Sequence, residues 1–493
     1  MSAAQDLAAD VLFLILSYLT ARELILVTHV CRHWRQSAIE IPLLWTNISD
    51  FHNKSRVAIF LKRAMSASVD FRRVPVDSDD DILLDIISRH LHHTRTLEIL
   101  LQGLDPIGCK SHGLRLFQTP APLLEELTVD GSALHRFFKV IVVPNWAESR
   151  IFGGSAPCLH SVSVLQISNV RGLLARLPQP EAVRDIHIDY GKGTAQRNID
   201  TVIAAIFPNA LNLYVNHSGW RIDEGVGHNA LWLGSLRTLH LRTDDQNVVN
   251  EFNYAPMLYA WSKLSVVSLD ISGGVCKDRM FSIRIPICGD EPYKSIEVIS
   301  RRSEGEWERD LLCIRAVTPS GRVRILNGFH PNHLESLLRT PEAERKLEEL
   351  RLDATGYRVA SMLHGVTLLA LRVLCLVAGE SVAALDLGRR WTANADFENF
   401  IQGIEDSVFI TPNLDALEFE SVGPPLTVPD TTTVDLNQNL WSIAAVVSSL
   451  QSFSLIQAGS KVPVIVLRGF KPQIGQVEML MASFAVRVIV AES

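Results

Sequence analysis

One short apolar pattern recurs along most of this 493-residue chain. It consists of an apolar residue, two variable residues, a second apolar residue, one variable residue and a third apolar residue. Alternating apolar positions over so few residues are typical of a β-strand with one buried face. Clear copies occupy Leu124–Val129, Leu236–Leu241, Leu347–Leu352, Leu371–Leu376 and Leu414–Phe419, and looser copies centre on Leu97, Val162, Ile186, Leu213 and Val267.

The spacing of these copies predicts how the strands are arranged. Neighbouring copies from Leu97 to Val267 lie 24 to 35 residues apart, close to the roughly 20–29 residues of a leucine-rich repeat. Strands that alternate with helices at such a period predict stacked βα units with a parallel sheet. We therefore expect an α/β leucine-rich-repeat-like solenoid over residues 77–493. Helical apolar stripes fill several gaps, at Ile82–Leu91, Ile199–Ile206, Leu334–Leu338 and Phe397–Ile404.

The stretch 280–330 departs from the regular spacing. The copies around it, at Val267 and Leu350, are 83 residues apart. Two further copies fit between them, at Ile296–Val298 and Val323–Ile325. We expect an irregular, β-rich part of the solenoid there.

One face of the predicted sheet is polar. The variable residue between the last two apolar positions is usually polar, whereas parallel strands buried on both faces would be apolar throughout. Repeat proteins bind partners along such extended faces, and aromatic and arginine side chains are common hot spots. Polar residues are also exposed on strands that bind nothing, so the alternative is that these residues face solvent and have no binding role. The expected target-binding residues are Glu98, His187, Tyr214, His240, Arg351 and Glu418.

The first fifty residues carry a dense helical pattern. One wide apolar stripe runs from Leu7 to Leu19, and a second helix follows a capping box made by Thr20 and Glu23. A third apolar group covers residues 42–48. Fifty residues cannot bury so much apolar surface alone, so these helices dock either on the rest of this chain or on a partner.

The same segment carries four ordered motifs. They are Leu7-x-x-Asp10-Val11-Leu12-x-x-Ile15-Leu16-Ser17-Tyr18-Leu19, Glu23-Leu24, Val30-Cys31-Arg32-x-Trp34-Arg35 and Pro42-x-Leu44-Trp45. This order and spacing resemble the F-box. The resemblance implies a small all-α module over residues 1–50 that binds a Skp-family adaptor and, through it, the cullin of an SCF-type ubiquitin ligase. Residues 51–76 are then expected to form a linking helix and an entry strand.

Helix-in-groove recognition uses apolar side chains at helical spacing. The adaptor-binding residues that the resemblance implies are Leu7, Val11, Leu12, Ile15, Leu16, Leu19, Leu24 and Val27, whereas Trp34 and Trp45 are expected to hold the helices together. Ala8 stands where the family has proline, which leaves the strength of adaptor binding open.

Other functional classes lack sequence support. A net charge of −7 does not fit a nucleic-acid binder, and no apolar run approaches the roughly 20 residues that span a membrane. The seven cysteines are scattered without a CxxC pair, which indicates a reducing, cytoplasmic or nuclear location. His90, His92 and His93 are expected at a solvated helix end, and we expect no metal, cofactor or catalytic residue.

The leading hypothesis is a non-catalytic substrate-receptor subunit of an SCF-type cullin–RING ubiquitin ligase, in which the solenoid binds a target protein. The alternative is a leucine-rich-repeat interaction scaffold that does not assemble into a ligase. A third class, an enzyme on the same fold, would show a tightly bound phosphate or metal after purification.

Overall fold

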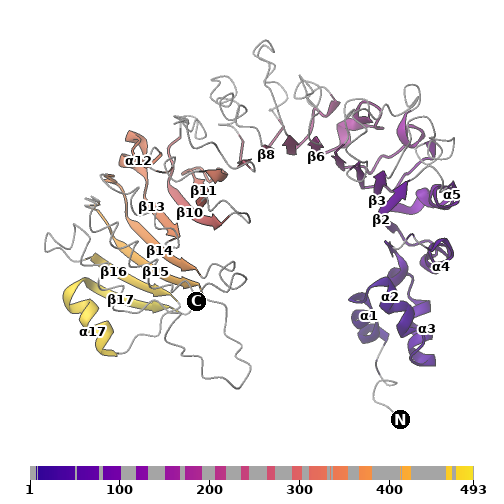
Figure 1. Cartoon of the computed structure of the whole chain (residues 1–493), viewed down its shortest axis with the longest axis horizontal. Helices are drawn as coiled ribbons and strands as arrows, with labels where there is room; N and C mark the ends of the chain where they lie inside the picture. The colour runs from indigo at the N-terminus through magenta and orange to yellow at the C-terminus, as the bar shows by residue number, and fades with distance from the viewer. Residues whose placement is uncertain are drawn as a thin grey trace. The chain divides into compact units, whose positions relative to one another are not determined.

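Figure 1 shows the computed structural model of the chain. It divides into two compact units, Met1–Leu241 and Arg242–Ser493, which we call unit 1 and unit 2. The structure describes residues 7, 9–49, 51, 53–76, 81–101, 118–131, 150–166, 173–190, 206–217, 235–243, 264–271, 291–302, 310–329, 334, 337–353, 366–379, 411, 413–422, 462–468 and 474–491.

Unit 1 begins with a small helical module. It contains α1 (Ala9–Ser17), α2 (Ala21–Val27), α3 (Arg32–Glu40) and the 3-10 helix η2 (Pro42–Trp45). The predicted capping box starts α2: the backbone N–H of Thr20 donates to Glu23 Oε2 at 2.8 Å, and the N–H of Glu23 donates to Thr20 Oγ1 at 3.4 Å. These hydrogen bonds satisfy amide groups that the first helical turn leaves without partners.

The module is joined to the sheet by the segment 51–76. Here the expected helix is α4 (Lys54–Ala64) and the expected strand is β2 (Val69–Val76), which pairs in parallel with β1 (Asn47–Ile48). Trp45 is buried, and its Nε1 donates to Ala38 O of α3 at 2.7 Å. Its ring lies 5.2 Å from that of Phe60 and beneath the guanidinium of Arg63, both on α4. As predicted, Trp45 holds helices together.

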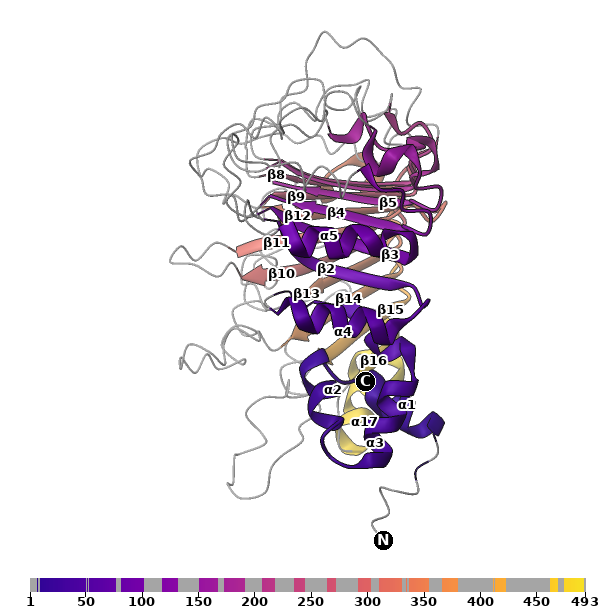
Figure 2. The same cartoon turned by 90° about the vertical axis from the view of Figure 1, so that its right-hand side faces the viewer.

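The sheet of unit 1 is parallel. After β2 come β3 (Thr94–Leu101), β4 (Glu126–Asp130), β5 (Ser161–Leu165), β6 (Asp185–Tyr190) and β7 (Asn212–His217), each paired with the next. β8 (Thr238–Thr243) follows β7, since the N–H groups of Arg237 and Thr238 donate to Leu211 O. The helix α5 (Asp81–His90) is followed by η3 (Leu91–His93), and Figure 2 shows α4 and α5 side by side against the strands. Two short 3-10 helices, η4 (Ile151–Gly154) and η5 (Pro180–Ala182), lie between later strands.

The core of unit 1 is a row of apolar side chains that crosses the sheet. The pairing register places Leu97, Leu127, Val162, Ile186 and Leu213 side by side, and each is at most 3% exposed. These are the middle positions of the repeated pattern. The alternating residues of the same strands lie on the opposite face, as a period of two requires.

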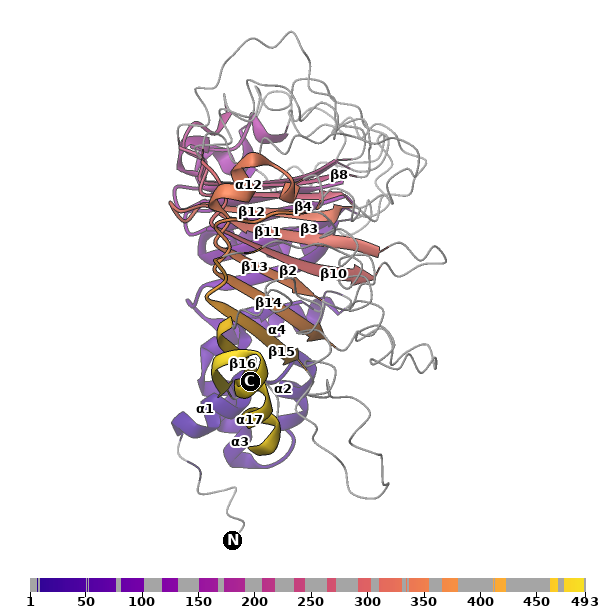
Figure 3. The ribbon, with the colours of Figure 1, turned by 90° about the vertical axis from the view of Figure 1, so that its left-hand side faces the viewer.

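Unit 2 also has a mostly parallel sheet (Figure 3), with one inserted antiparallel strand. Its first four strands are β9 (Val266–Ile271), β10 (Ser295–Arg302), β11 (Asp310–Val317) and β12 (Val323–Phe329). β12 pairs in parallel with β9, β11 lies antiparallel between β12 and β10, and β10 pairs in parallel with β13. This hairpin arrangement is the irregularity that the sequence predicts at 280–330.

The remaining elements of unit 2 return to the regular order. They are α12 (Pro341–Lys346), β13 (Glu349–Asp353), β14 (Val373–Gly379), β15 (Ala416–Val422), β16 (Val462–Arg468), α17 (Ile474–Ser483) and β17 (Ala485–Ala491). Each of the strands from β13 to β17 pairs in parallel with the next. Of the expected helical stripes, most of 199–206 and all of 397–404 lie outside the described residues.

The two extra copies expected in unit 2 are both strands, but the second is shifted by one residue. Ile296 and Val298 of β10 are buried as expected. In β12 the buried residues are Arg324 and Leu326, not Val323 and Ile325, so the expected inward residues were wrong. The Arg324 side chain is fully buried. Its charge is tolerated there because Nη1 donates hydrogen bonds to the carbonyls of Val323 at 2.9 Å and Ser265 at 3.5 Å.

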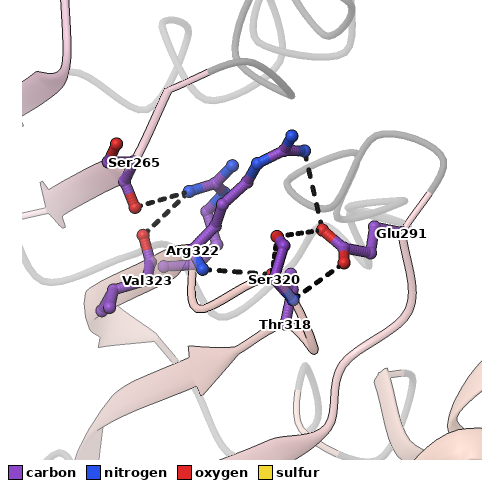
Figure 4. Close-up of polar contacts among 7 residues, drawn as sticks. Ser265, Glu291, Thr318, Ser320, Arg322 and Val323 are labelled. Carbon is purple, nitrogen blue, oxygen red and sulfur yellow. Dashed lines mark hydrogen bonds and ion pairs between the residues drawn. The ribbon is translucent and has the colours of Figure 1, made fainter.

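The turn between β11 and β12 is held by polar contacts (Figure 4). Ser320 donates to the carboxylate of Glu291 from its backbone N–H at 2.9 Å and its Oγ at 2.5 Å. Arg322 Nη1 lies 3.6 Å from the same carboxylate, and these contacts lower the pKa of Glu291, the Ser320 hydroxyl most of all. Gly321 supplies the positive φ of 83° that the turn requires.

Candidate functional site

Helix α1 presents an apolar stripe to solvent. Val11, Leu14, Ile15 and Tyr18 are 45, 58, 39 and 82% exposed. Val11, Leu14 and Ile15 lie on one side of the helix, and Tyr18, which directly follows the last residue of α1, continues their spacing. We call these four residues the α1 stripe. Leu26, Val30 and Leu43 of the same module are also exposed, by 60–65%.

The predicted adaptor-binding residues divide into three groups. Leu12, Leu16 and Leu24 are buried in the core of the helical module, at 0, 0 and 4% exposure. Val11 and Ile15 belong to the α1 stripe. Leu7, Leu19 and Val27 are half-buried, and Ala8 lies outside the described residues.

Sequence reasoning missed Leu14 and Tyr18 as surface residues. In α1 almost every residue is apolar, so periodicity marks two overlapping stripes without showing which is inside. The run 11, 14, 15, 18 has the i, i+3, i+4, i+7 spacing that could have identified the second stripe. A module with its own buried core and a separate exposed stripe is suited to helix-in-groove binding.

The polar face of unit 1 brings together three of the predicted target-binding residues. His187, Tyr214 and His240 lie on β6, β7 and β8, and successive side chains meet across the strands. The ring centroids of Tyr214 and His240 are 4.3 Å apart with an interplanar angle of 2°, and those of His187 and Tyr214 are 6.0 Å apart. Desolvation lowers the pKa of both histidines, with a smaller opposing effect of Asp189 on His187. Glu98 lies on the same face, on β3, and is half-buried.

The other two predicted target-binding residues lie in unit 2 and form ion pairs there. Arg351 Nε lies 3.3 Å from Glu297 Oε1, and Arg315 Nη1 lies 3.6 Å from Glu297 Oε2. Glu418 Oε2 lies 3.5 Å from Arg468 Nε. Because β14 separates β13 from β15, Arg351 and Glu418 do not form one cluster.

The three histidines lie at the end of α5, where His92 is exposed and His90 is half-buried, but His93 is buried, so the expectation of a solvated helix end was wrong for His93. His93 is only 5% exposed, and its Nδ1–H donates to Ala67 O at 3.0 Å. His90 Nδ1 lies 2.9 Å from His93 Nε2, and the rings of His92 and His93 stack at 4.6 Å. Desolvation first, and then neighbouring charge, lowers the pKa of His90 and of His93.

No candidate metal site emerges from the described residues, in which no group of three or more His, Cys, Asp or Glu side chains could hold an ion. Within those same parts of the chain, none of the helices is long and apolar enough to cross a membrane.

Comparison with known proteins identifies one part of the chain. No curated protein matches it. The family model described as F-box-like matches residues 9–50, which form α1, α2, α3, η2 and β1. The N-terminal helical module is therefore an F-box-like domain.

Proposed function

We propose that this chain is a substrate-receptor subunit of an SCF-type cullin–RING ubiquitin ligase. Its F-box-like domain binds a Skp-family adaptor, which carries the cullin, and its leucine-rich-repeat-like sheet binds a target protein. The subunit makes and breaks no bond itself. It acts in the cytoplasm or nucleus by holding the target near the ligase, which raises the effective concentration of the target there.

The observation that carries this proposal is the α1 stripe. Leu12 and Leu16 of the same helix are completely buried, so the domain does not need the stripe for its own core. Contiguous exposed apolar side chains mark interaction sites more often than single ones do. Leu14 and Tyr18 are the most exposed residues of the α1 stripe, and we assign them the central adaptor contacts, with Val11 and Ile15 beside them.

The alternative is a scaffold with the same sheet that does not assemble into a ligase. It differs from the proposal in one observable property, the presence of the adaptor and cullin in complexes of the full chain. Affinity purification of the tagged full chain from cells separates the two possibilities. The informative variant is Leu14→Asp combined with Tyr18→Asp, which places charge on the stripe without touching the core.

A control is Leu123→Asp, which introduces one negative charge, against two in the stripe variant, at a leucine that is 43% exposed outside the F-box-like domain. We expect the adaptor and cullin to be recovered with the wild type and with the control, and to be lost from the stripe variant. Target proteins should remain bound to all three chains. Equal recovery of the adaptor with the stripe variant, or no adaptor with the wild type, would contradict the proposal.

A further inference from the structure

The strand β17 is the outermost strand of unit 2 (Figure 1). It pairs in parallel with β16 along one edge, and no other described strand of unit 2 pairs with its second edge. Such an open edge offers unpaired backbone N–H and C=O groups to an extended chain, and proteins commonly protect it with proline or several charged residues. The residues Ala485–Ala491 contain no proline, and Arg487 is their one charged residue. β17 therefore lacks this protection against pairing.

The apolar core of unit 2 reaches the surface at β17. Val488 lies beside Ile465 in the pairing register, and Ile465 is completely buried. Val490 lies beside Leu467, which is also completely buried. Val490 itself is 47% exposed, and Val488 is half-buried. Val486 lies on the same face by the strand period of two and is 72% exposed. Three valines therefore form an uncovered apolar strip where the core ends.

The sequence of β17 is nearly the same in both directions. Read outward from Val488, it has valine at 486 and 490 and alanine at 485 and 491, and only residues 487 and 489 differ. Two copies of β17 that pair antiparallel about Val488 bring Val486 of each copy opposite Val490 of the other. Side chains directly opposite each other across an antiparallel pair are close enough to contact. The six valines of the two copies therefore form one apolar patch, in which each copy covers the strip of the other.

Charge favours the same register. On the other face, pairing about Val488 sets Arg487 opposite Ile489 of the second copy, so the aliphatic stem of the arginine packs on isoleucine while its charge stays in water. Pairing about residue 487 would instead place the two arginines directly opposite each other, which destabilises a strand pair. The antiparallel pair has two-fold symmetry and uses the open edge of both copies, so the assembly closes at two chains.

We propose that β17 pairs antiparallel with β17 of a second copy, centred on Val488, and that this chain is a homodimer in solution. The interface does not involve the α1 stripe and goes beyond the proposed function. A single strand pair is a small interface, so we expect a dissociation constant in the micromolar range. Each dimer carries two F-box-like domains and two target-binding sheets, which raises the effective concentration for a target that has two binding segments.

Sedimentation equilibrium of the purified full chain, from low micromolar to a few hundred micromolar, tests the dimer. We expect a reversible equilibrium between monomer and dimer. Val486→Lys should raise the dissociation constant of the dimer by at least about tenfold, because it places a charge against Val490 of the second copy. The matched control is Val30→Lys, at a valine that is 65% exposed in the F-box-like domain, and it should leave the equilibrium unchanged. A wild-type chain that stays monomeric or grows beyond a dimer, or equal effects of the two lysines, would overturn the proposal.

Opposite charges at residue 489 test the register. Ile489→Glu places a carboxylate opposite Arg487 of the second copy, twice in each dimer, whereas Ile489→Lys places a like charge there. The dimer of the glutamate variant should be tighter than that of the lysine variant by about tenfold or more. Both variants lose the same isoleucine, so the difference between them reports the charge, and urea unfolding shows whether each is folded. Equal dissociation constants for the two folded variants would overturn antiparallel pairing about Val488.

Discussion

Arg95 donates two hydrogen bonds to the carboxylate of Asp70, from Nε at 3.1 Å and from Nη2 at 2.6 Å. The pair joins β3 to β2. The backbone N–H of Asp70 in turn donates to Thr46 O at 2.8 Å, at the end of the F-box-like domain. One residue therefore links the F-box-like domain to the sheet through its backbone and its side chain.

Asp70→Asn should destabilise the chain by about 1.5–3 kcal/mol, the usual contribution of a hydrogen bond to a charged group. Asp70 is 6% exposed, so little water reaches its position to accept the hydrogen bonds of Arg95 in place of the carboxylate. The control is Asp415→Asn, which removes the exposed partner of Arg372 and should cost no more than about 1 kcal/mol. Urea unfolding of both variants checks this, and equal losses would show that burial of Asp70 is irrelevant.

Trp45→Ala should cost about 3–5 kcal/mol, as expected for a large buried aromatic side chain. The change removes the hydrogen bond to Ala38 and the contacts with Phe60 and Arg63 that connect α3 to α4. Thermal unfolding measures the loss. The half-buried Trp34 provides the control, since Trp34→Ala should cost clearly less. A smaller effect at residue 45 than at residue 34 would contradict the packing described for this joint.

We expect the histidine cluster to lower the free energy of unfolding on mild acidification. Because the pKa values of His90 and His93 are lowered in the folded chain, the unfolded chain takes up protons first as the pH falls. The contribution of the neutral rings is complete above the ordinary value of 6.5. It is lost progressively as the pH drops from there towards the lowered folded values, and it does not fall further below them.

His93→Gln should therefore reduce the dependence of the unfolding midpoint on pH between about pH 8 and pH 5. The glutamine amide can still donate to Ala67 O. The same substitution at the exposed His33 of α3 controls for the change of residue type. Identical slopes in the wild type and the His93 variant would show that this cluster does not couple to folding.

Ala8→Pro should strengthen adaptor binding by about 0.4–1 kcal/mol, since proline at the first turn of a helix restricts the unbound chain. This prediction comes from the sequence, where alanine replaces the proline of the F-box pattern. Ala3→Pro, which precedes the F-box-like match, should have no effect on the dissociation constant. An unchanged or higher dissociation constant for the Ala8 variant would show that the family proline makes no contribution here.

The sequence predicted the strands well, because the core of a parallel sheet requires apolar residues at alternating positions. Leu350 and Leu374 are neighbours in one buried row, and both are middle positions of the repeated pattern. The strand order around β11 could not be predicted, since the pairing of β12 with β9 depends on contacts between segments far apart in the chain. The burial of Arg324 was also missed. A charged residue in an apolar row is tolerated only where carbonyl groups accept its hydrogen bonds, and the sequence does not show where those carbonyl groups lie.

The candidate site was predicted less completely than the fold. Periodicity identified α1 as a helix but could not separate the buried Leu12 from the exposed Leu14, because both belong to apolar stripes. On the sheet, alternation placed Tyr214 and Arg351 on the polar face alike. Only the pairing register shows that Tyr214 joins a row of rings, whereas Arg351 pairs with Glu297.

The most direct test of the central claim is a calorimetric titration of purified Skp-family adaptor into the purified full chain. We predict saturable one-to-one binding to the wild type and to Leu123→Asp. For Leu14→Asp combined with Tyr18→Asp, we predict a dissociation constant at least about thirtyfold higher, since burying an unpaired polar group costs roughly 2–7 kcal/mol. The same dissociation constant for the stripe variant and the wild type, with both chains folded, would contradict the account, and so would an absence of binding to the wild type.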